Sequence, residues 1–275
     1  MNPGSATRKA TMLDRTVQPQ KWLLHHRSTR KLCKNLPIKS FLGCFFTRFF
    51  YRVELRSPMN IVQKIDSEIE RRSLLKHSFY QMWSEGKLTI DHLRGYSLEY
   101  FQLVKAVPKF VESIAAKAMD NKDIASNARE EAEHIEPWVR FAGALGVPRS
   151  DLVDYAGAAK TDAAVAKMMT LANASFEEAV AAMYAYEMEL PKISRSKIDG
   201  LKKFYGMSSG DATKYFEIHE EADVRHARVW REILDKIPAE KQEAAFAAAV
   251  ESLKAQNMLL DSVQERYVGS SRMNC

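Results

Sequence analysis

The chain has 275 residues, 46% of them hydrophobic, and a formal net charge of +6 at pH 7. This length suffices for one sizeable core and hardly for two, so one main domain is expected. Twelve Lys and Arg against Asp14 and Glu54 give residues 1–58 a net charge of +10, which leaves residues 59–275 with −4. Because this larger part has no basic stripe for phosphates, nucleic acid is not expected as a partner.

Residues 1–58 mix Pro, Ser, Thr and basic residues without a sustained helical period. This composition predicts a disordered N-terminal extension with two candidate origins, a targeting peptide or sequence upstream of a true start at Met59. We favour the start at Met59, because a clean amphipathic pattern begins there, directly after Ser57 and Pro58.

The cysteines and the apolar segments bear on the compartment. Cys33, Cys44 and Cys275 lie in the extension or at the last residue, so the body has neither a disulfide nor a thiol nucleophile, which fits a reducing compartment. The apolar stretch 41–51 is too short to span a bilayer, which needs about 20 apolar residues. We therefore expect a cytoplasmic protein without a membrane segment, with organellar targeting by residues 1–58 as the alternative.

From Ile61 onward, apolar positions recur at helical spacing, and runs of alternating β-branched residues bounded by turn signals are missing. Residues 59–275 are therefore predicted to form an all-α domain. Gly86, Gly146 and Gly206 mark the ends of several helices. The expected helices cover roughly residues 60–85, 89–106, 108–120, 123–145, 149–157, 160–173, 175–190, 193–206, 210–236 and 238–262.

The predicted helix 123–145 carries a cluster of acids with one histidine. Glu131 and His134 have the i,i+3 spacing that carboxylate-bridged di-iron bundles use for metal ligands, and Glu130 at i,i+4 is also within reach. Four glutamates within seven residues are equally typical of an acidic helix surface. Taken alone, the segment supports both interpretations.

Glu187 lies in a segment, 179–191, whose apolar residues run almost all round the predicted helix. Such a helix is buried, and a carboxylate in its wall is costly without a cation beside it. The cation is either a metal ion or an Arg or Lys from another helix.

His219, Asp223 and His226 follow on the predicted helix 210–236 and are separated by four and three residues. At about 100° per residue, the three side chains fall within an arc of about 60° on one helix face. Two imidazoles and a carboxylate together are a ligand set for first-row transition metals. A chance pairing of His and Asp on a helix surface is the alternative.

Together, the three helices supply enough ligands for two metal ions, with positions left open for dioxygen. A ferritin-like site would contain Glu-x-x-His twice, whereas this sequence contains it once and adds His-x3-Asp-x2-His. A different helical bundle is therefore indicated.

Further motifs are spread along the chain: the run 77–89 (HSFYQMWSEGKLT), Tyr96, residues 107–109 (VPK), His134 with Trp138, residues 144–147 (ALGV), and residues 184–187 (YAYE) with Pro191. With the more specific run 219–228 (HEEADVRHAR), they resemble the haem-oxygenase-like di-metal oxidases. This is the family of the chlamydial protein associating with death domains, and pyrroloquinoline quinone synthase and thiaminase II are more distant relatives. The likeness covers nearly all of residues 59–275.

The resemblance implies a haem-oxygenase-like helical bundle with a di-metal site. The implied ligands are those that the spacing already selects, namely Glu131 or Glu130, His134, Glu187, His219, Asp223 and His226. The stretch between the first acidic ligand and His134 is about three residues shorter here than in the chlamydial relative, which is one helical turn. The choice between Glu131 and Glu130 therefore stays open.

The resemblance also implies an activity. Close relatives form para-aminobenzoate for folate synthesis and are understood to consume one of their own tyrosines, with a lysine as the suggested amino donor. The matching residues are Tyr80, Tyr96 and Lys197, which without the resemblance read as two core aromatics and a surface lysine. We expect an iron-dependent oxidoreductase, with an iron–iron or iron–manganese centre, that uses dioxygen and a reductant and acts about once per chain. A homodimer is one option for its assembly.

Other functions of this bundle are the alternatives. Thiaminase II needs a cysteine nucleophile, which the body lacks. Haem oxygenase needs an early proximal histidine, for which His77 is a candidate, but haem does not explain the acidic residues. A metal-free oxidase like pyrroloquinoline quinone synthase predicts activity without iron. A non-catalytic protein that binds helical partners such as death domains predicts binding that survives loss of His219 and His226.

Overall fold

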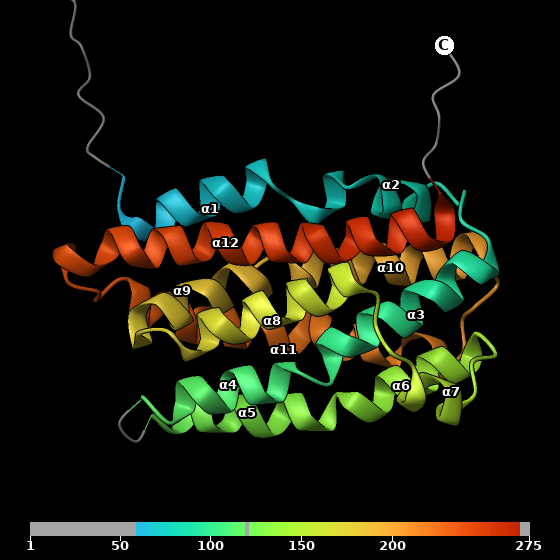
Figure 1. The fold of residues 1–275 in the computed structure, drawn as a ribbon, viewed down its shortest axis with the longest axis horizontal. Coiled ribbons are helices and arrows are strands. Elements are labelled where there is room, and N and C mark those ends of the chain that lie inside the picture. The colour runs from blue at the N-terminus through green and yellow to red at the C-terminus, as the bar shows by residue number, and fades with distance from the viewer. Residues whose placement is uncertain (1–58, 119–120, 270–275) are drawn as a thin grey trace, which may run out of the picture. The chain divides into compact units, whose positions relative to one another are not determined.

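The computed structural model describes residues 59–118 and 121–269, and every regular element in this part is helical, as predicted (Figure 1). The predicted extension 1–58 lies outside the described residues. The elements are α1 (Ile61–Arg71), η1 (Leu74–Lys76), α2 (Ser78–Ser84), α3 (Ile90–Val104), α4 (Val107–Ala115), α5 (Lys122–Glu133), α6 (Ile135–Ala144), α7 (Arg149–Asp154), α8 (Ala159–Asn173), α9 (Phe176–Glu187), α10 (Leu190–Phe204), α11 (Gly210–Leu234), α12 (Ala239–Val263) and η2 (Gln264–Val268).

Two long helices organise the bundle. Helix α12 packs against α9 and α8 and, on another side, against α1 (Figure 1). Helix α11 packs against α10, α6 and α9 and also reaches α5. The candidate ligands lie on α5, α9 and α11 and at the junction of α5 with α6, so α11 stands next to every element that carries one.

The predicted helix 60–85 is wrong as a single element, because the chain breaks into α1, η1 and α2. Local hydrogen bonds interrupt it. The Ser73 hydroxyl accepts from the Leu75 amide, the Leu74 amide donates to a Glu189 oxygen at 3.0 Å, and the His77 ring accepts from the Phe79 amide. These bonds satisfy the backbone groups that a continuous helix would have paired.

The predicted helix 123–145 is also two elements, α5 and α6, which meet at His134. Pro137 is the third residue of α6 and has no amide hydrogen, so it cannot donate to the Glu133 carbonyl, which favours a break in the helix there. The His134 amide instead bonds to the Glu131 carbonyl, three residues earlier. The tighter turn places His134 at the junction.

The predicted turn residues behave as expected at Gly86 and Gly146, whose φ angles of 69° and 83° lie in the left-handed region that glycine adopts without strain. Within residues 59–118 and 121–269, none of the helices combines the length and apolarity that a membrane crossing requires.

Close packing at Gly200 gives a test of the fold. A Cβ at Gly200 would lie 2.6 Å from the buried Trp83 ring, whereas a Cβ at Gly143, also helical, meets nothing within 4 Å. We expect Gly200→Ala to lower the free energy of unfolding by about 1–3 kcal/mol through overpacking. Gly143→Ala should leave it unchanged or raise it by up to about 1 kcal/mol. Urea unfolding of both variants measures this, and equal behaviour of the two would contradict the packing of α2 on α10.

Candidate metal centre

Helix α11 presents His219, Asp223 and His226 on one buried face, as the spacing predicts. Ser209 caps the start of this helix through the Ala212 amide, and regular helix continues through all three positions. Asp223 and His226 are each 0% exposed. The alternative of a His–Asp pairing on the helix surface is therefore wrong.

Helix α5 and the helix junction contribute Glu131 and His134, and α9 contributes Glu187. All three are buried. The Trp230 indole donates to Glu187 Oε2 at 2.6 Å, and among the described residues Glu187 has no ion pair with Lys or Arg. Within the described residues, the structure therefore does not show the alternative, a salt bridge from Glu187 to an Arg or Lys of another helix.

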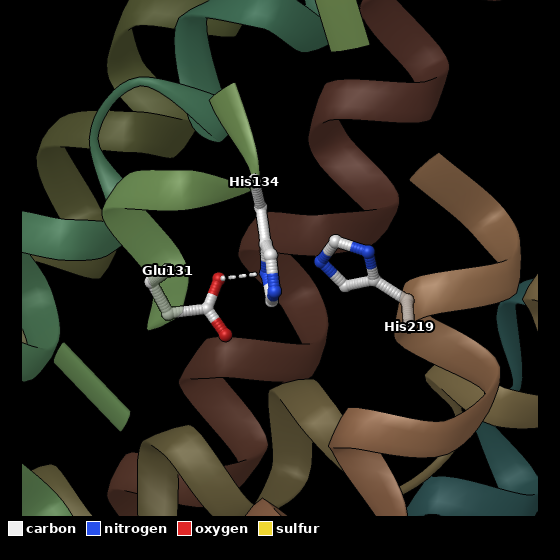
Figure 2. Close-up of side chains that lie close together, drawn as sticks. All are labelled: Glu131, His134 and His219. Carbon is white, nitrogen blue, oxygen red and sulfur yellow. Dashed lines mark hydrogen bonds and ion pairs between the residues drawn. The ribbon is translucent and has the colours of Figure 1, made fainter. Parts of the chain in front are cut away.

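These side chains form two groups that share Glu131. Ligand atoms of Glu131, His134 and His219 lie within 4.8 Å of one another, and so do those of Glu131, Glu187 and His226. Figure 2 shows the first group, in which Glu131 lies 3.3 Å from His134 Nδ1 and the His219 ring from α11 faces the His134 ring. A carboxylate common to two such groups has the geometry to bridge two ions.

Asp223 belongs to neither group but lies beside the second, with Oδ1 3.6 Å from His226 Nδ1. Among the described residues, both of its buried carboxylate oxygens have no hydrogen-bond partner, and the same holds for Glu187 Oε1 and His226 Nδ1. Unpartnered buried carboxylate oxygens are costly, and a metal ion satisfies them. The donor set thus fits metal ions with mixed oxygen and nitrogen coordination.

The pKa shifts of the clustered carboxylates and of His226 reflect their burial and their closeness to one another. Burial raises the pKa of Glu187 well above its usual value, and burial likewise raises that of Asp223. Burial alone would lower the pKa of His226, but the nearby carboxylates of Asp223 and Glu131 raise it to about 11. Burial would raise the pKa of Glu131, yet the hydrogen bond from His134 and the nearby His226 ring hold it below its usual value. A bound cation would take the place of these protons.

Glu131 and Glu130, which the spacing leaves open, have different surroundings. Glu131 is buried and contributes to both groups. Glu130 is 29% exposed and lies 3.0 Å from Arg225 and 3.3 Å from His226 Nε2. The structure therefore brings Glu131 into the cluster and places Glu130 at its edge.

A second buried cluster contains the tyrosines and the lysine implied by the resemblance. Lys197 is 4% exposed, so its interpretation as a surface lysine is wrong. Its amine donates to the Tyr96 hydroxyl at 2.5 Å and lies 4.7 Å from the centre of the Tyr80 ring. The Tyr80 and Tyr96 hydroxyls are 3.3 Å apart. Burial lowers the pKa of Lys197 and raises the pKa of both tyrosines.

Neighbouring aromatic rings connect the two clusters. The ring centroids of Tyr215 and His219 are 4.1 Å apart, and those of Trp138 and Tyr215 are 4.7 Å apart. The ring centroids of Trp138 and Tyr96 are 5.6 Å apart. The roles of Tyr215 against His219 and of Trp230 against Glu187 are not among the predictions. The sequence nevertheless indicates both roles. Tyr215 and Trp230 each lie four residues from a candidate histidine on α11 and therefore share a helix face with it.

His77, the candidate for a haem ligand, lies elsewhere. Its ring accepts from the Phe79 amide at the start of α2, and its Nε2 lies 3.1 Å from Asp261. Both ring nitrogens are thus engaged in holding α2, which leaves neither for haem iron.

Comparisons with known proteins agree with this architecture. Residues 63–265 match the profile of the TENA/THI-4/PQQC family. The chain is 34% identical over 212 residues to a 4-aminobenzoate synthase of Chlamydia trachomatis serovar D, covering 74% of this chain and 92% of that protein. It is 33% identical over 224 residues to a 4-aminobenzoate synthase of Nitrosomonas europaea, covering 74% and 91%.

Two solved structures support the fold. A domain of unknown function with a haem-oxygenase-like fold from Shewanella denitrificans has a TM-score of 0.66 at 19% identity, covering 78% of this chain and 98% of that one. A TenA homologue from Pseudomonas syringae pv. tomato has the same TM-score and identity, covering 74% and 93%. The predicted haem-oxygenase-like helical bundle is confirmed.

Asp223 gives a test of the buried charge. Its pKa is raised, so the ionised form is disfavoured in the fold relative to the unfolded chain. We expect Asp223→Asn to raise the free energy of unfolding of chelator-treated protein by about 1–3 kcal/mol. Glu221→Gln, an exposed acid on the same helix, should change it by less than about 0.5 kcal/mol. Urea unfolding with a chelator measures both, and a destabilised Asp223→Asn variant would argue against unsatisfied charge at this position.

Proposed function

The chain belongs to the TENA/THI-4/PQQC family, and on that premise we propose that it is a di-metal, dioxygen-dependent oxidase that forms 4-aminobenzoate from its own Tyr80. The observation that carries the proposal is the pair of buried carboxylate–histidine groups sharing Glu131, close to a buried tyrosine–lysine cluster. The names of the Chlamydia and Nitrosomonas relatives support the same product.

The ions would be held by the residues that converge. Glu131 would bridge, with His134 and His219 on one side and with Glu187 and His226 on the other, and Asp223 is close enough to His226 to join the second group. Carboxylate and imidazole ligands suit iron and manganese, so iron–iron and iron–manganese are the proposed pairs. When bound, the pair supplies electrons to dioxygen, with an external reductant.

The chain's own residues would prepare the phenol and the amine. Burial keeps the Tyr80 phenol protonated and favours the uncharged amine of Lys197, the form that has a lone pair to give. The rings of Phe79 and Tyr96 pack against Tyr80, which is 3% exposed and thus shielded from water. In the overall conversion the Tyr80 Cα–Cβ bond and the Lys197 Cε–N bond would break. Cβ would become the carboxylate carbon with oxygen from dioxygen, and the Lys197 nitrogen would replace the phenolic oxygen, which leaves as water. Cα would take up hydrogen and Cε would be oxidised to an aldehyde, with dioxygen as oxidant and electrons from the external reductant. Each chain would then act once.

The two alternative functions would require other structural features. A metal-free oxidase like pyrroloquinoline quinone synthase would give no reason for three carboxylates to be buried together, two of them with oxygens that no described residue partners. A non-catalytic partner-binding protein would use its surface, whereas the unusual residues of this chain are interior. Metal content therefore distinguishes the proposal from both alternatives.

The metal proposal predicts two ions per wild-type chain by elemental analysis of protein loaded with iron or manganese. Glu131→Ala should lose both ions, because it removes the shared ligand, and His226→Ala should lose one. Glu133→Gln removes an exposed charge from the same helix and should keep both. Wild-type protein without bound metal would end the di-metal proposal.

The substrate proposal predicts that Tyr80→Phe forms no 4-aminobenzoate, because the side chain that becomes the product is changed. Product is measured by mass spectrometry after incubation with metal, reductant and dioxygen, and wild-type yield should not exceed about one molecule per chain. Protein grown with ¹⁵N-lysine should give ¹⁵N-labelled product. Tyr205→Phe, which alters another tyrosine in contact with Trp83, is the control and should retain the product. Undiminished product from Tyr80→Phe would refute the assignment.

A further inference from the structure

We infer that Glu130 is a positioning residue that orients His226, and that it is not itself a metal ligand. This inference rests on the proposed metal site and names the residue that fixes one of its histidines. Nothing in the sequence distinguishes Glu130 from Glu131 in this respect, since both lie within helical reach of His134.

The two ring nitrogens of His226 face different partners. Nδ1 points to the buried carboxylates, at 3.3 Å from Glu131, 3.6 Å from Asp223 and 3.9 Å from Glu187. Nε2 lies 3.3 Å from Glu130 Oε2 on the other side of the ring. Nδ1 is therefore the nitrogen that can bind metal, and Nε2–H is the donor to Glu130.

Glu130 is held in place for this task. Arg225 donates to Glu130 Oε2 at 3.0 Å, and the Ser126 hydroxyl donates to Oε1 at 3.4 Å. The guanidinium keeps the carboxylate ionised, and both contacts fix the direction from which it accepts the proton of Nε2. A carboxylate fixed in this way selects the tautomer of a metal-binding histidine and makes its free nitrogen more basic.

His219 on the same helix is oriented by a different acceptor. Its Nδ1 donates to the Tyr215 carbonyl at 2.8 Å, which leaves Nε2 for metal. The two histidines of α11 thus present opposite ring nitrogens to the cluster, and each is fixed at its other nitrogen. A backbone carbonyl serves His219, so only His226 depends on a side chain for its orientation.

The position of Glu130 agrees with a role outside the set of metal ligands. Glu130 and Arg225 line an open surface cavity of about 1260 Å³, which His226 itself does not line. The Glu130–Arg225 pair therefore stands between this cavity and the ring of His226. Removing the Glu130 side chain would free the ring to rotate and would expose its Nε2 to water.

The test is a titration of metal-free full-length protein with Co²⁺, followed by its visible absorption and by competition with a chelator. We expect Glu130→Ala to weaken one of two Co²⁺ sites by about 10–100-fold and to leave the other site unchanged. Glu130→Gln keeps an acceptor for Nε2–H and should weaken the same site by less. Glu133→Gln, which removes an exposed charge from the rim of the same cavity, should bind as wild type.

Each other outcome has a definite meaning. Unchanged Co²⁺ affinity in Glu130→Ala would overturn the inference and leave Glu130 as a partner of Arg225 only. Complete loss of one ion in Glu130→Ala at saturating Co²⁺, with both ions kept by Glu131→Ala, would overturn it in favour of Glu130 as the ligand. Failure of wild-type protein to bind Co²⁺ would instead refute the proposed metal site, so the two failures are distinguishable. Circular dichroism of the metal-free variants confirms that each is folded.

Discussion

The constraint on which the structure depends is the burial of three carboxylates, those of Glu131, Glu187 and Asp223, within 3.9 Å of a single histidine, His226. Like charges at this spacing repel one another, and each loses hydration on entering the bundle. His226 and the indole of Trp230 compensate in part, but three carboxylate oxygens have no hydrogen-bond partner in the part of the chain that the structure describes. The interior is therefore suited to bind positive charge, and this arrangement lowers the free energy of unfolding of the metal-free protein.

Helix geometry makes this arrangement rigid. Helix α11 is 25 residues long, and regular helix holds its three polar side chains in a row between α5, α9 and α10. The break at His134 separates α5 from α6 and leaves both Glu131 and His134 buried at the junction. A continuous helix through this point would keep His134 in strict register with Glu131, whereas the junction lets the imidazole meet His219.

Sequence periodicity predicted those parts of the site that depend on one helix. The row His219, Asp223, His226 follows from 3.6 residues per turn, and burial of Glu187 follows from the apolar surroundings on its own helix. Lys197 was not predictable in this way, because α10 is rich in exposed lysines and its burial depends on α2 and α3 packing over it. The choice between Glu130 and Glu131 likewise depends on how α5 is rotated against α11, which is a property of the assembled bundle.

The location of Tyr80 explains why a chain that consumes this residue would act only once. Tyr80 is a core side chain on α2, a helix of seven residues between the break at Ser73–His77 and Gly86. Loss of a buried aromatic side chain leaves a cavity that costs about 3–5 kcal/mol, a large share of the stability of a domain. Consuming Tyr80 would therefore weaken its packing against Phe79 and Tyr96 and destabilise α2, a helix of seven residues. The same event that forms the product would free it from a buried site, and the spent chain would lack the core needed for a second round.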